Sequence, residues 1–314
     1  MSYIRYLCRR AAFAVLTAYL VVTLTFFVIA STVRLRLQQR LALASYGGAS
    51  EEQLESIREG FVAARNLDTP IHERYVGWLV DVTTLDWGFS VAYRRPVIAV
   101  LDGRVQATLG YVLPGVALAV LAGVLLGLFA ALAKDGPFDW SVRLTAYAVF
   151  GVPVFMLVIY LRYLASTGVV PLSLGRRALA TTAVAASLLA GQVRFARAAA
   201  LEQTGRAFVK MLRAKGADRY RLARHVLRNA AIPIVSLSTT ELLAVLVLNI
   251  YIVEEVVGIR GLADASLRAI RTSDTALVIW TTLVVVLVGI TASFLQDVLH
   301  GSLDPRIRSD TDHR

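Results

Sequence analysis

The chain has 314 residues, of which 57% are apolar, with a mean hydropathy of +0.62 and a formal net charge of +11. Several apolar runs of about 20 residues, the length that crosses ~30 Å of hydrocarbon, exclude an ordinary soluble domain. Lys and Arg favour the cytoplasmic loops of membrane proteins, and this explains the positive charge better than nucleic-acid binding does. The lone Cys8 excludes an intrachain disulfide and a cysteine-based metal site.

Six transmembrane helices are predicted in chain order. The first follows Arg5, Arg9 and Arg10, and its apolar run is too long for the core of a cleavable signal peptide. We therefore expect it to remain as an uncleaved helix. The six predicted spans are residues 11–32, 107–133, 144–164, 178–196, 234–253 and 276–299.

Three of these spans carry local signals. Gly123 and Gly127 in the second span have the spacing that lets two membrane helices approach closely. Gly151 and Pro153 predict a kink in the third span, because proline removes a backbone donor. The fourth span, residues 178–196, is rich in alanine and gains little from facing lipid. We expect it inside the bundle.

The spans predict an all-α integral membrane protein with an external insert between helices 1 and 2 and a cytoplasmic loop between helices 4 and 5. The insert contains two helical patterns, 51–66 and 71–82. The expected organisation is an N-terminus with the first helix at 1–32, an external subdomain at 33–106, a five-helix core at 107–303 that includes the cytoplasmic loop 197–233, and a cytoplasmic tail at 304–314.

The distribution of Lys and Arg predicts the orientation. With the N-terminus inside, the short cytoplasmic segments hold 17 Lys or Arg and the short external loops hold six. The insert is left out because loops longer than about 60 residues do not influence orientation. The sequence therefore predicts a multi-pass protein of the cell membrane with both termini in the cytoplasm.

The cytoplasmic loop 197–233, called the basic loop below, holds nine Lys or Arg and two acidic residues between Arg197 and Arg228. Phe208, Met211 and Leu212 fall at i, i+3 and i+4, which predicts one apolar face on a short helix.

Gly216 suits the left-handed residue that ends this helix, and Asp218 suits the cap of the next one. Periodicity alone leaves two interpretations open. The basic loop is either a membrane-surface hairpin with cations at lipid headgroups or a contact for a partner protein.

Polar residues inside the predicted spans form a second group of candidates. An ionised Glu241 inside the fifth span costs a few kcal/mol unless it is paired. It could pair with Arg194, line a solute path or be protonated. Asn249 could line the path or bond to another helix. The chain contains no GK[ST] phosphate-binding motif and no catalytic constellation, so it is not expected to be an enzyme.

Several motifs resemble those of ABC-transporter permeases of the dipeptide/oligopeptide type. RAKG at 213–216 and RHVLRNAAIP at 224–233 are similar to the cytoplasmic loop of that family. Other similar segments follow in the family's order: LDTP at 67–70, RPV at 95–97, GVPVF at 151–155, VEEVVG at 253–258 and DPRIR at 304–308. The family's L-x-P-G-D-P element after the first span is replaced by residues 34–43, so the insert is expected to begin differently.

The resemblance implies a permease subunit that binds no cofactor of its own. Its implied partners are a second permease, expected to be a distinct homologue, two ATP-binding cassette ATPases that bind the ATP, an external solute-binding protein and membrane lipid. Glu254 and Glu255 begin an external loop that could meet the binding protein or form a gate. Residues 206–228 would couple to an ATPase, with the contact expected at Phe208, Met211, Leu212, Ala214, Lys215, Gly216 and Asp218.

Two functions remain open at this stage. In the first, the chain lines half of an ATP-driven import path, and the cargo could be a dipeptide, an oligopeptide, a nickel complex or a sugar. In the second, it is an ion-coupled secondary transporter or channel subunit, in which Arg194 and Glu241 are the working residues and the basic loop is a surface hairpin.

Overall fold

A computed structural model describes residues 3–63, 66–168 and 175–303. Within these ranges the side chains of residues 3, 232, 236–248, 300, 302 and 303 are not described. The described part is helical apart from turns and one hairpin of two-residue strands. Its elements are α1 (Tyr3–Tyr46), α2 (Glu51–Ala63), α3 (Ile71–Thr84), β1 (Phe89–Ser90), β2 (Arg95–Pro96), α4 (Val97–Leu132), α5 (Pro137–Gly151), α6 (Val154–Ser166), α7 (Arg176–Thr204), α8 (Ala207–Ala214), α9 (Arg219–Val257), α10 (Leu262–Arg271) and α11 (Thr275–Leu303).

Long apolar helices confirm the expected all-α membrane class. Among the described residues, α1, α4, α7 and α11 are each long and apolar enough to cross a membrane, and α5 with α6 makes a fifth if this bent pair counts as one span. The expected fifth span lies within α9, but most of its side chains fall in the range 236–248, outside those described. The count of six spans therefore stays a prediction.

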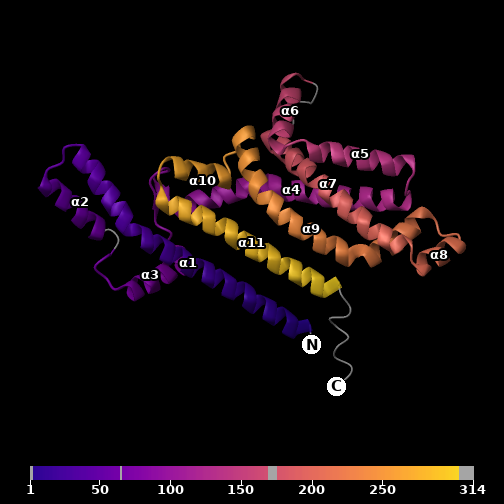
Figure 1. The fold of residues 1–314 in the computed structure, drawn as a ribbon, viewed down its shortest axis with the longest axis horizontal. Coiled ribbons are helices and arrows are strands. Elements are labelled where there is room, and N and C mark those ends of the chain that lie inside the picture. The colour runs from indigo at the N-terminus through magenta and orange to yellow at the C-terminus, as the bar shows by residue number, and fades with distance from the viewer. Residues whose placement is uncertain (1–2, 64–65, 169–174, 304–314) are drawn as a thin grey trace.

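The long helices lie side by side along one axis (Figure 1). Helix α8 lies at one end of this bundle, towards the start of α1 and the end of α11. Helices α2, α3 and α10 lie towards the opposite end. The alanine-rich helix α7 packs against α4, α5, α6 and α9 and is the most buried of the candidate spans, as its composition predicts.

Close packing of α4 against α7 depends on small residues. A Cβ atom added at Gly127 would lie 2.6 Å from the carbonyl oxygen of Val193 and 2.8 Å from the Cβ of Ala196. A Cβ added at Gly123 would collide with the side chain of Gln192. The predicted close approach at this glycine pair is thereby confirmed, because only glycine leaves room for the facing backbone.

We expect Gly127→Ala to destabilise the folded chain by about 1–3 kcal/mol, since the added methyl group overpacks a backbone contact that has no free space. Thermal unfolding of the detergent-solubilised protein measures this as a lower midpoint. Gly110→Ala is the matched control on the same helix, because nothing lies within 4 Å of its added Cβ. Equal midpoints for the two variants would contradict the close packing of α4 against α7 at Gly127.

The third predicted span is broken rather than kinked. Helices α5 and α6 meet at an angle of 100°, with Val152 and Pro153 between them. Val152 has an extended conformation, with ψ of 118°, as the residue before a proline prefers. The proline signal in the sequence is therefore confirmed, and the bend is larger than a kink in one continuous helix.

The helices extend past the predicted membrane boundaries. Helix α1 continues to Tyr46, although its apolar run ends near residue 32, and α4 begins at Val97 rather than at 107. Polar residues such as Arg34, Arg36 and Arg40 are good helix formers, so hydropathy marks where the membrane ends and not where the helix ends. Helices α2 and α3 confirm the two helical patterns expected in the insert.

The insert is tied to the bundle by aromatic stacking and one buried carboxylate. Trp280 of α11 stacks on Trp87, with ring centroids 4.3 Å apart, and on Trp78 of α3 at 5.1 Å. Asp274, which precedes α11, accepts hydrogen bonds from the Ser90 hydroxyl at 2.6 Å and from the backbone N–H of Ala92 at 2.9 Å. These contacts fix the β1–β2 hairpin against the start of α11.

Candidate functional site

The basic loop folds as a helix–turn–helix. Helix α8 ends before Gly216, whose φ of +73° is a left-handed conformation that suits glycine. The Asp218 carboxylate then accepts a hydrogen bond of 2.7 Å from the backbone N–H of Arg221 and caps α9. Both predicted local roles are confirmed.

The helix–turn–helix is packed against the ends of α4 and α7. Val209 of α8 and Val226 of α9 are fully buried in this contact, next to Leu128 of α4 and Ala200 of α7. The packing draws on hydrophobic side chains from four helices. Because of this packing, α8 is attached to the end of the bundle by buried hydrophobic contacts and is not a free loop.

The predicted contact residues divide between two faces. Phe208 and Leu212 are half-buried and pack against the same hydrophobic cluster, so they point mainly into the protein. Met211 is 52% exposed. The remaining predicted contact residues, Ala214, Lys215, Gly216 and Asp218, are exposed as well.

Two clefts with different chemistry flank this turn. A basic cleft of about 590 Å³ is lined by Asp218, Tyr220, Arg221, Arg224, His225 and Arg228. An apolar cleft of about 470 Å³ is lined by Phe129, Leu132, Ala133, Phe138, Arg219 and Tyr220. The surface at the start of α9 thus offers cationic and apolar groups together, which suits a protein partner with an acidic rim.

A buried ion pair fixes the point at which the basic loop leaves the bundle. Arg197 of α7 donates two hydrogen bonds to Asp139 of α5, at 2.6 Å from Nε and 2.7 Å from Nη2. Asp139 is fully buried, and it also accepts a hydrogen bond of 3.0 Å from the backbone N–H of Asp135. The two-point geometry orients the end of α7 relative to α5.

The structure describes the surroundings of two of the three polar residues predicted inside the spans, Asn249 and Arg194, but not those of Glu241. Asn249 of α9 donates a hydrogen bond of 3.1 Å to the Ser187 hydroxyl of α7, so it makes the interhelical bond that was one of its two expected roles. The guanidinium of Arg194 lies 4.9 Å from the ring centroid of Phe195. The side chain of Glu241 lies outside the described side chains, so its pairing with Arg194 stays a prediction.

The two adjacent glutamates in the last turn of α9 have opposite environments. Glu254 is 1% exposed and bonds to α4 and α10. This rules it out as a surface contact for a binding protein. Glu255 is exposed and pairs with Arg271 at 3.0 Å. The sequence did carry a signal for this burial, because Glu254 shares one helical face with Ile250 and Val257.

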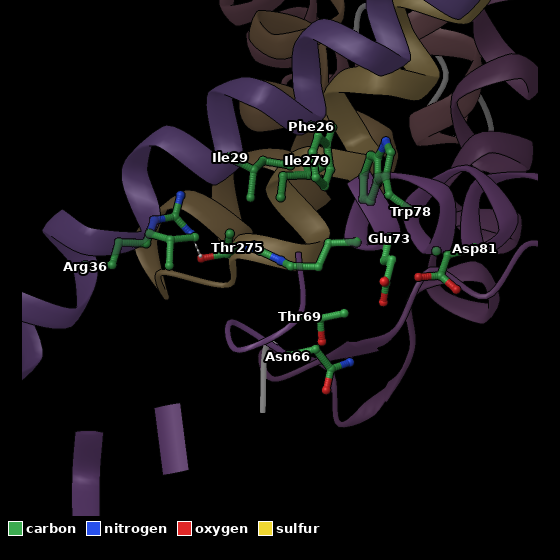
Figure 2. A pocket seen from close by; sticks show the side chains of 13 residues that line it. Phe26, Ile29, Arg36, Asn66, Thr69, Glu73, Trp78, Asp81, Thr275 and Ile279 are labelled. Carbon is green, nitrogen blue, oxygen red and sulfur yellow. Dashed lines mark hydrogen bonds between the residues drawn. The ribbon is translucent and has the colours of Figure 1, made fainter. Parts of the chain in front are cut away.

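A further cleft of about 470 Å³ lies between α1, α3 and the start of α11 (Figure 2). Arg36 lines it from α1 and donates a hydrogen bond of 3.0 Å to Thr275 of α11. Glu73 and Asp81 line it from the α3 side. Partial desolvation raises the pKa of Asp81 above its usual value, and the nearby charge of Asp86 raises that pKa further. The cleft is therefore lined by charges of both signs, since Arg74 adds a second cationic group to Arg36.

Comparison with known proteins gives these features a context. The family described as the binding-protein-dependent transport system inner membrane component matches residues 123–309. This range includes the basic loop, α9, α10 and α11. The chain belongs to this family. The resemblance inferred from the motifs is therefore confirmed, and this family member is a multi-pass membrane component of a transport system.

Similar proteins extend the match beyond that region. The permease is 27% identical to a dipeptide transport system permease of Bacillus subtilis, over 81% of this chain and 85% of that protein. It is 25% identical to a dipeptide transport system permease of Lactococcus lactis, over 97% of this chain and 99% of that protein. It is 30% identical to an oligopeptide transport system permease of Mycobacterium tuberculosis, over 77% and 82%.

Proposed function

We propose that this chain is the transmembrane subunit of an ATP-driven importer for peptides. It lines half of the path with six spans, keeps both termini in the cytoplasm and hydrolyses no ATP itself. Its relatives are named as dipeptide and oligopeptide permeases, and this supports a peptide cargo over a nickel complex or a sugar.

The observation that carries the proposal is the exposed turn at the end of α8. Coupling to an ATPase requires a rigid part that transmits force, because a flexible segment would absorb the movement. Val209 and Val226 hold α8 against α4 and α7, while Met211 and Lys215 face outward. We propose that this outer face of residues 206–228 sits in a groove of the ATPase.

The proposed assembly has one such turn for each of two ATPases, a second permease that is a distinct homologue, and an external solute-binding protein. The basic cleft at the start of α9 supports an ATPase surface that carries acidic residues around an apolar groove. Lipid surrounds the exposed apolar faces of the spans, such as that of α1.

Co-purification of the tagged permease with its ATPases tests the proposal. We expect Met211→Asp to lower the recovered ATPase by about tenfold, since a carboxylate at the centre of an apolar contact must be desolvated without a partner. Met211→Leu is the matched control and should retain the ATPase. Uptake that persists in ATP-depleted cells, or in proteoliposomes that lack an ATPase, would contradict the proposal and favour an ion-coupled transporter.

A further inference from the structure

The outer end of α9 holds a buried carboxylate that the proposed coupling does not use. The Oε1 atom of Glu254 accepts hydrogen bonds from the Thr108 hydroxyl at 2.5 Å and from the Tyr111 hydroxyl at 3.0 Å, both on α4. Its Oε2 atom accepts a hydrogen bond of 2.9 Å from the backbone N–H of Asp264 in the first turn of α10. One carboxylate therefore joins α9, α4 and α10, and we call this set of bonds the Glu254 clamp.

The start of α10 packs closely against the clamp. The hydroxyl oxygen of Thr108 also accepts a hydrogen bond of 2.8 Å from the backbone N–H of Leu262, at the start of α10. A side chain at Gly261 would collide with the carboxyl group of Glu254 and would lie 2.5 Å from the Thr108 hydroxyl. The start of α10 thus reaches the clamp only because residue 261 is a glycine.

Two more contacts hold α10 in the same position. Arg104 of α4 pairs with Asp264 at 2.9 Å. At the other end of α10, the backbone N–H of Asp274 donates a hydrogen bond of 2.8 Å to the carbonyl oxygen of Ala269. Ala265 and Ala269 are fully buried between these ends. Helix α10 is therefore joined to α4 and α9 at its start, and its end is closed by the turn before α11.

The clamp lies in the last turn of the helix that begins in the basic loop. Helix α9 runs without a break from Arg219 to Val257, about 58 Å at 1.5 Å per residue. Its first turn follows the proposed ATPase contact, and its last turn contains Glu254. Figure 1 shows α8 and α10 at opposite ends of the bundle, with α9 between them.

From this arrangement we infer that Glu254 is a positioning residue for the ends of α4, α9 and α10 that lie opposite the basic loop. It clamps α10 to α4 and to the end of α9, so that the outer ends of these three helices move as one body when the inner end of α9 moves. The clamp itself is independent of the partners. The movement as one body rests on the proposed ATP-driven function.

The test uses the permease in complex with its ATPases in lipid nanodiscs. Spin labels are attached at Gln106→Cys on α4 and Ile270→Cys on α10, in a Cys8→Ser background, and the distance between them is measured by pulsed electron paramagnetic resonance. Both positions are exposed, so that labels do not disturb the core.

Without nucleotide, we expect one narrow distance distribution that Glu254→Gln broadens, because an amide in place of the carboxylate weakens three charge-assisted bonds. Glu255→Gln is the matched control, since its carboxylate is exposed and pairs only at the surface. Thr108→Val should also broaden the distribution, and Thr108→Ser should retain the narrow one. If Glu254→Gln lowers the yield of folded protein, the Thr108 pair decides the result.

With ATP and vanadate, we expect the α4–α10 distance to stay unchanged in the unsubstituted protein. A reference label pair at Ser141 on α5, which is exposed and lies outside the proposed ATPase contact, and Arg271 on α10 should change its distance. An α4–α10 distance that changes with nucleotide would overturn the single outer body. A narrow distribution in both Glu254→Gln and Thr108→Val would overturn the clamp. An unchanged reference pair would instead contradict the proposed ATP coupling, and the measurement without nucleotide would still decide the clamp.

Discussion

Replacing Gly216 by proline is expected to abolish ATP-driven transport while the protein still inserts into the membrane. Proline fixes φ near −65°, whereas Gly216 has φ of +73°, so the turn between α8 and α9 cannot form. Uptake of a labelled peptide measures the loss, and the amount of protein in isolated membranes measures insertion. We expect uptake to fall at least about a hundredfold, because an interaction required by the whole cycle is removed.

A graded series at the same position separates backbone conformation from a general defect. Asn tolerates the left-handed region better than Ala does, so Gly216→Asn should retain more uptake than Gly216→Ala, and Gly216→Pro should retain least. No atom lies within 4 Å of a Cβ added at this position, so steric contact does not explain such an order. Normal uptake in the proline variant would show that this turn is not the coupling element.

Removing Arg197 from its pair with Asp139 is expected to cost about 3–5 kcal/mol of stability, because Asp139 then keeps a buried charge without compensation. Arg197→Met should lower the thermal unfolding midpoint of the purified permease strongly. Asp139→Leu should lower it less, because the Arg197 side chain that remains is partly exposed to solvent. Replacing both residues together should cost much less than the two single losses added, since no uncompensated charge is then left buried.

The control for this cycle is the exposed pair of Arg206 and Glu202, which lies one helical turn apart at 3.0 Å. Removing either partner there should change stability by less than about 1 kcal/mol, because both side chains are solvated. If the losses of stability in the Asp139–Arg197 cycle are additive, the two residues do not interact directly. Arg197 would then not orient the basic loop through Asp139.

Elements that depend on local sequence could be predicted well. The helix–turn–helix of the basic loop follows from the spacing of its apolar residues, from Gly216 and from Asp218, and each acts within a few residues of its own position. The same holds for the break at Pro153, where the missing backbone donor and the restricted residue before it are covalent properties.

The helix alone could not predict that Phe208 and Leu212 are half-buried while Met211 is exposed. All three lie on one apolar face, and periodicity does not say how much of that face the protein itself covers. The ends of α4 and α7 decide this, because they supply Leu128 and Ala200 as the packing partners.

The sequence by itself determined that this is a helical membrane protein of a transport family with a basic helix–turn–helix before its fifth predicted span, because hydropathy, proline and glycine act locally. Only the tertiary structure decided which charges are paired inside the protein. Asp139 and Arg197 are 58 positions apart and Thr108 and Glu254 are 146 apart. A local pattern cannot show which distant donor meets a buried carboxylate, since that depends on how the helices pack.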